Sequence, residues 1–104
     1  MALPAEYQTL KLWRSCKVIT YYDHDTCSHD RCDVKLDCNL LIEYLDEGQI
    51  ISYRGPNDGS GHFLLKSSDV GGSATLHLNP KHLVLEGSWS EGGCNGMWKI
   101  FLES

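Results

Sequence analysis

Apolar and polar residues alternate with a period of two from Cys16 to near the C-terminus, which is the pattern of half-buried β-strands. Short clusters of turn-forming residues interrupt this alternation at positions 46–48, 55–61, 67–72, 79–80 and 92–96. Strands joined by such short turns pair with their neighbours in an antiparallel meander. The pattern therefore predicts an all-β fold.

The length of each turn predicts which residues face one another, because opposed positions in an antiparallel hairpin have a constant sum. All predicted pairs place apolar or small side chains on one shared face of the sheet. The predicted pairs are Tyr44 with Ile51, Ile42 with Tyr53, Tyr53 with Phe63, Ile51 with Leu65, Phe63 with Leu76, Leu65 with Ala74, Leu78 with Leu83, Leu76 with Leu85, Leu85 with Leu102, Gly87 with Ile100, and Trp89 with Trp98.

Two further strands are predicted upstream of these hairpins. One covers residues 16–22, and the other is a long alternating strand that contains Val34, Leu36, Cys38 and Leu40. This makes about seven strands. A twisted meander with one apolar face covers that face by curling into a small barrel or half-barrel.

The N-terminal segment has a different period. Its apolar residues follow helical spacing at Leu3, Tyr7, Leu10 and Trp13. With Pro4 near the start, this spacing predicts a short amphipathic helix within residues 1–14, followed by the meander over residues 15–104. Neither a linker composition nor a fixed repeat divides the chain, so we expect a single domain over residues 1–104.

The last hairpin carries a motif of the form G-x-W followed by G-x-W-x-I-x-L, at residues 87–89 and 96–102. It resembles the hairpins of small lipocalin-like (calycin-type) β-barrel proteins. The resemblance covers residues 85–102 and implies a meander barrel whose interior binds a small apolar or cyclic ligand. The N-terminal G-x-W of lipocalins is absent, and Leu12-Trp13-Arg14 stands in its place.

Composition and charge narrow the choice of partners. The 104 residues are 41% apolar and 10% aromatic, which fits one ordinary folded domain. Nine basic residues against 14 acidic ones give a net charge of −5. This balance disfavours nucleic acid and anionic membranes as partners. No apolar run reaches membrane-spanning length and the start lacks a signal-peptide pattern, so we expect a cytoplasmic protein.

The chain has five cysteines, an odd number that allows no complete disulfide framework, so free thiols are expected. Cys16 and Cys38 share the inward phase of two predicted adjacent strands, which predicts that they are buried close together. Cys94 lies in a glycine-rich turn without a neighbouring base. No catalytic residues are identified, and we expect a non-enzymatic protein without a cofactor.

Residues 23–33 form a predicted loop rich in acids, cysteine and histidine. His24, Cys27, His29 and Cys32 offer thiolate and imidazole ligands for zinc, although structural zinc sites usually space their ligands as two separate pairs. The simpler interpretation is a polar, solvent-exposed and metal-free loop. Calcium is disfavoured, because an EF-hand loop that begins at Asp23 has Ser28 where glycine is required.

The candidate ligand-binding residues are aromatic. Tyr22, Tyr44 and Tyr53 face inward in the predicted register, and a buried phenol needs a hydrogen-bond partner. Trp89 and Trp98 are predicted side by side over small residues, where they either line a pocket or fill the core.

Two functions follow from these patterns. The first is a barrel that binds a small apolar or aromatic molecule with Tyr44, Tyr53, Trp89 and Trp98. The alternative is a protein–protein interaction module that uses the acidic Cys/His loop or an uncovered sheet edge, as a monomer or a self-associating homodimer.

Overall fold

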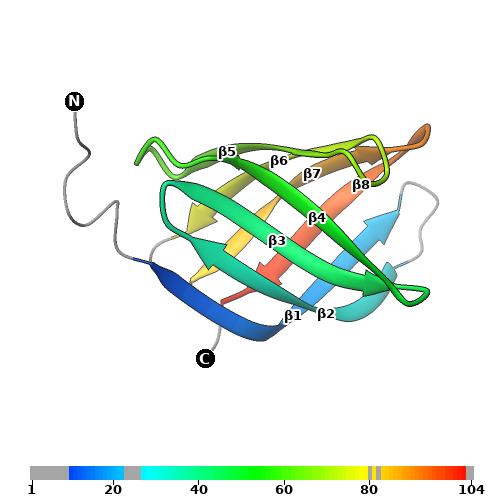
Figure 1. Ribbon diagram of the computed structural model, residues 1–104, viewed down its shortest axis with the longest axis horizontal. Coiled ribbons are helices and arrows are strands. Elements are labelled where there is room, and N and C mark those ends of the chain that lie inside the picture. The colour runs from blue at the N-terminus through cyan, green and yellow to red at the C-terminus, as the bar shows by residue number, and fades with distance from the viewer. Residues whose placement is uncertain (1–9, 23–26, 80, 82, 103–104) are drawn as a thin grey trace.

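The computed structural model describes residues 10–22, 27–79, 81 and 83–102. These residues form eight strands: β1 (Lys11–Tyr22), β2 (Cys27–Leu36), β3 (Asn39–Asp46), β4 (Gln49–Pro56), β5 (His62–Ser67), β6 (Gly72–Asn79), β7 (Val84–Glu91) and β8 (Cys94–Phe101). Each strand pairs antiparallel with the next, and β1 also pairs with β8, so the sheet closes into a barrel (Figure 1). The predicted all-β meander is confirmed.

The barrel has one strand more than predicted, because residues 27–33 form most of β2 instead of a loop. The chain turns at Asp37 and Cys38, which divides the predicted long strand in two. The Asp37 carboxylate accepts a hydrogen bond from the Asn39 N–H at 2.9 Å, as a turn-forming aspartate does. The alternation in β2 is hard to see in the sequence because its inner face carries Asp30 and Cys32 where the other strands carry apolar residues.

The predicted N-terminal helix is wrong over residues 11–14, which belong to β1. Its residues 1–9 lie outside the described residues. The β1–β2 register shifts between Trp13 and Cys16, where Ser15 has a φ of 54° and donates its N–H to Asp33 Oδ1 at 2.8 Å. A bulge adds one residue to the alternation of a strand, so two inward residues come to be three positions apart, as they are in a helix.

Two of the predicted hairpin registers are confirmed. The β3–β4 ladder pairs Tyr44 with Ile51 and Ile42 with Tyr53, and the β5–β6 ladder pairs Phe63 with Leu76 and Leu65 with Ala74.

The other three predicted registers are wrong in their partners. The observed pairs are Arg54 with Lys66, Leu78 with Leu85, Leu76 with Gly87, Leu85 with Ile100, Gly87 with Trp98, and Trp89 with Gly96. In the last hairpin only Gly92 and Gly93 form the turn, so the ladder extends further toward it than predicted. Each displacement is an even number of residues, which keeps the predicted inward residues of the strands inside the barrel. Leu83 is the exception, because it precedes β7 and is 47% exposed. Trp89 and Trp98 thus share the inner face without lying directly opposite.

The core fills the barrel with side chains from every strand. Its largest fully buried members are Tyr53, Phe63, Leu40, Ile42, Leu65, Leu76, Leu85 and Ile100. No helix among the described residues is long and apolar enough to cross a bilayer.

Candidate functional site

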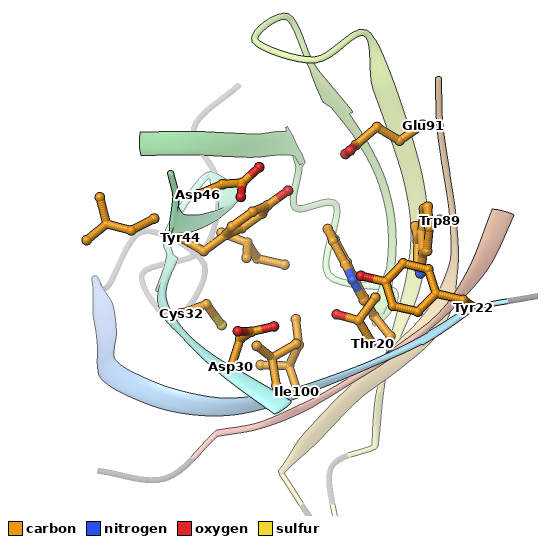
Figure 2. A pocket seen from close by; sticks show the side chains of 13 residues that line it. Thr20, Tyr22, Asp30, Cys32, Tyr44, Asp46, Trp89, Glu91 and Ile100 are labelled. Carbon is orange, nitrogen blue, oxygen red and sulfur yellow. The ribbon is translucent and has the colours of Figure 1, made fainter. Parts of the chain in front are cut away.

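A cavity of about 180 Å³ opens at the end of the barrel where β1, β3 and β7 finish (Figure 2). It lies at the end of the packed core and faces outward between the strand ends. The residues that line it are Val18, Thr20, Tyr22, Asp30, Cys32, Ile42, Tyr44, Leu45, Asp46, Trp89, Glu91, Trp98 and Ile100. This opening is called the barrel mouth below.

Aromatic rings form a continuous row around the barrel mouth. Tyr22 contacts Trp89 edge to face, with ring centroids 5.6 Å apart, and Trp89 lies 6.5 Å from Trp98. Trp98 in turn meets Tyr44 at 6.2 Å and Tyr53 at 4.9 Å, both edge to face. Because each ring is held by the next, the aromatic wall is already arranged without a ligand.

Tyr53 is fully buried beneath this wall and does not line the cavity itself. Its hydroxyl donates a hydrogen bond of 2.5 Å to Glu91 Oε1. Burial raises the pKa of Tyr53, and the hydrogen bond to Glu91 raises it further. The contact satisfies the buried phenol and positions the Glu91 carboxylate over the cavity.

Three carboxylates surround the opening, Asp30 from β2, Asp46 from β3 and Glu91 from β7 (Figure 2). Among the described residues, no lysine, arginine or histidine lines the cavity. Burial raises the pKa of Tyr44, and the nearby charges of Glu91 and Asp46 add to the shift. The barrel mouth is therefore electronegative as well as aromatic.

Cys32 lies at the inner part of the cavity, on the strand position opposite Cys16. Both thiols are buried and neither forms a disulfide. Burial, followed by the proximity of Cys16 and Asp33, raises the pKa of Cys32 to about 12. The predicted burial of Cys38 beside Cys16 is wrong: Cys38 is exposed in the β2–β3 turn, and Cys32 takes the expected place.

The candidate zinc ligands do not meet at one point in the described part of the chain. Cys27 and His29 are exposed on the outer face of β2, whereas Cys32 is buried on the inner face. His24 lies outside the described residues. Among the residues that are described, no group of three or more His, Cys, Asp or Glu side chains is placed to hold a metal ion.

Trp89 brings a buried hydrogen-bond donor to the site. The side chain is only 7% exposed, so little water reaches it, and its Nε1 has no acceptor among the described residues. A buried donor usually has a partner in the protein, in water or in a ligand.

Three of the four ligand-binding residues predicted from the sequence line the cavity, and the fourth lies beneath them. Tyr44, Trp89 and Trp98 line the cavity, while Tyr53 supports them from below. The three carboxylates Asp30, Asp46 and Glu91 are not among the residues predicted from the sequence. Asp30 lies two residues before Cys32 in β2, so both side chains point to the inner face of the barrel. The alternation would therefore have predicted the position of Asp30 if residues 27–36 had been identified as a strand.

A second, more open depression of about 520 Å³ lies beside the barrel mouth, between β2 and β3. The β2–β3 ladder extends only from Leu36 opposite Leu40 to Asp33 opposite Glu43. The depression shares Asp30, Cys32, Tyr44 and Leu45 with the cavity. The cavity is thus bordered by an opening in the side of the barrel.

Comparisons with protein-family models, with curated proteins and with solved structures find no match. The resemblance of residues 85–102 to lipocalin-like barrels stays a prediction.

Proposed function

We propose that this chain is a non-enzymatic β-barrel domain that binds a small molecule in the barrel mouth. The supporting observation is the cavity of about 180 Å³ with an aromatic wall. A cavity of about 150 Å³ accommodates benzene, so this one has room for a single ring with a short substituent. Small eight-stranded barrels hold either packed side chains or one small ligand, and ligand sites combine apolar walls with a few polar groups.

Binding without catalysis is favoured by the chemistry of the lining residues. The one thiol of the cavity, Cys32, has a pKa raised to about 12, so it is not a thiolate at neutral pH and is a poor nucleophile. The described lining contains no histidine to act as its base. No cofactor is proposed.

A cytoplasmic location is part of the proposal. No disulfide joins any of the five cysteines, not even the directly opposed Cys16 and Cys32. Thiols persist in reducing compartments, which supports this location.

The proposal predicts that filling the cavity abolishes binding. Thr20→Phe places a ring in the cavity from its wall, and Thr75→Phe makes the same change on the outer face of β6 as a control. A panel of single-ring alcohols, amines and acids is tested for its effect on the thermal unfolding midpoint, which rises when a ligand binds the native state. We expect some members to raise the midpoint of the parent and of Thr75→Phe, and none to raise that of Thr20→Phe.

Two results would contradict the proposal. Undiminished shifts in Thr20→Phe would place binding elsewhere on the molecule. A strong loss of stability in Thr20→Phe alone would mean that the cavity has no room for an added ring.

A protein–protein interaction module is the second candidate, and an exposed apolar pair favours it. Leu45 and Ile50 are cross-strand partners beside the barrel mouth and are 72% and 62% exposed. Exposed apolar patches often mark interaction surfaces, including those of homodimers. Sedimentation of the parent and of a Leu45→Ser/Ile50→Ser variant tests this candidate. Self-association that the variant loses would support it.

A further inference from the structure

We infer that the ligand of the barrel mouth is a small organic cation, a protonated amine that carries an apolar or aromatic group. This inference rests on the proposed binding function and adds the chemical class of the ligand. Two independent features of the mouth support it, the arrangement of the rings and the sign of the charge.

The rings form the walls of a cage for a cation. Tyr22, Tyr44, Trp89 and Trp98 all line the same cavity and belong to four different strands. The electron-rich faces of aromatic rings attract ammonium groups, most strongly for tryptophan and in sites shielded from water. Alkylammonium groups are commonly bound in cages of this composition.

The carboxylates have no cationic partner in the described part of the molecule. Glu91 accepts the hydrogen bond of the Tyr53 hydroxyl, and Asp30 accepts one from the Ser28 hydroxyl at 3.2 Å. These neutral donors leave the negative charges in place. The nearest arginine along β2, Arg31, lies on the outer face and donates to the Ser15 carbonyl at 3.1 Å. The mouth therefore repels anions and has negative charge available for a cation.

The placement of the charges matches a ligand with a polar end and an apolar end. Ile42, Ile100 and Val18 line the inner part of the cavity, whereas Asp30 and Asp46 are exposed at its rim. An amine between the carboxylates directs its apolar group inward against the rings. Burial raises the pKa of Tyr44, and the negative charges of Glu91 and Asp46 raise it further.

A charge series of nearly equal shape tests the inference. Benzylammonium, benzyl alcohol and benzoate have one ring and a short substituent that is cationic, neutral or anionic. Their affinities are measured by calorimetry at low ionic strength, where surface charges are least screened. We expect benzylammonium to bind at least about tenfold more tightly than benzyl alcohol, which is about 1.4 kcal/mol. Benzoate is expected to bind most weakly.

Matched variants distinguish the effect of the carboxylates in the barrel mouth on binding from the effect of the net charge of the protein. Asp30→Asn and Asp46→Asn are each expected to weaken benzylammonium binding roughly threefold, since both are solvent-exposed, and to leave benzyl alcohol unchanged. Glu86→Gln changes the net charge by the same amount on the outer face of β7 and is expected to have little effect. Tyr44→Leu removes an aromatic ring and is expected to weaken benzylammonium binding roughly tenfold. Tyr44→Phe keeps the ring and is expected to keep the affinity.

The outcomes distinguish the two proposals. Benzyl alcohol that binds as tightly as benzylammonium overturns the cationic ligand and leaves the binding function standing. Equal effects of Asp30→Asn, Asp46→Asn and Glu86→Gln also overturn it, because the preference would then reflect overall charge. Failure of all three compounds to bind the folded parent contradicts the binding function itself.

Discussion

Cys32 connects the packed core to the cavity, because its thiol is buried beside Cys16 while its side chain borders the open space. Its raised pKa of about 12 follows mainly from burial, which disfavours the charged thiolate. At neutral pH the side chain is therefore a neutral thiol. The residue therefore acts as a small apolar group in the wall of the site.

Thiol labelling of the native protein tests this assignment. Cys27, Cys38 and Cys94 are exposed and are expected to react with iodoacetamide, while Cys16 and Cys32 react only after unfolding. Peptide mass spectrometry identifies the modified positions. Alkylation of Cys32 in the folded protein as fast as that of Cys94 would show that the inner face of β2 is assigned incorrectly.

The strands differ in how well their partners could be predicted from sequence. The β3–β4 hairpin was predictable because its turn consists of Glu47 and Gly48, which leaves no freedom of register. Between β4 and β5 the longer connection is held by a tertiary contact that the sequence pattern does not reveal, the hydrogen bond from the Asn57 N–H to the Cys38 carbonyl oxygen at 3.0 Å. Register over a long loop depends on such tertiary contacts, although the alternation still gives the correct face.

At Gly87, strand β7 passes so close to β6 that a side chain does not fit. A Cβ at this position would collide with the Thr75 carbonyl oxygen and approach the Leu76 backbone. We expect Gly87→Ala to lower the free energy of unfolding by about 3 kcal/mol, because the backbone of two paired strands must move apart.

Urea unfolding of Gly87→Ala measures this loss. The neighbouring Ser88→Ala is the control, since Ser88 is exposed on the outer face, and it is expected to change the free energy of unfolding by less than about 0.5 kcal/mol. Equal stability of Gly87→Ala and Ser88→Ala would contradict the observed β6–β7 register.

At the scale of the whole molecule, closure of β1 against β8 creates the site. The β1–β8 ladder brings Thr20 opposite Trp98 and Tyr22 opposite Gly96, although these residues are far apart in sequence. The aromatic candidates were predictable from alternation alone, because Tyr44, Trp89 and Trp98 share the inward phase. The acidic rim was not, because Asp46 and Glu91 end their strands beside turns, where acidic residues are common for local reasons.

Binding of a small molecule inside the barrel mouth would change the surroundings of the tryptophan side chains that line it. The indole N–H resonances of a ¹⁵N-labelled sample test it most directly, because the chain has three tryptophans and only Trp89 and Trp98 line the cavity. During titration with benzylammonium, we expect the resonances of Trp89 and Trp98 to shift along one saturating curve while that of Trp13 stays in place. Unmoved Trp89 and Trp98 resonances in the folded protein, or an equal shift of all three, would contradict it.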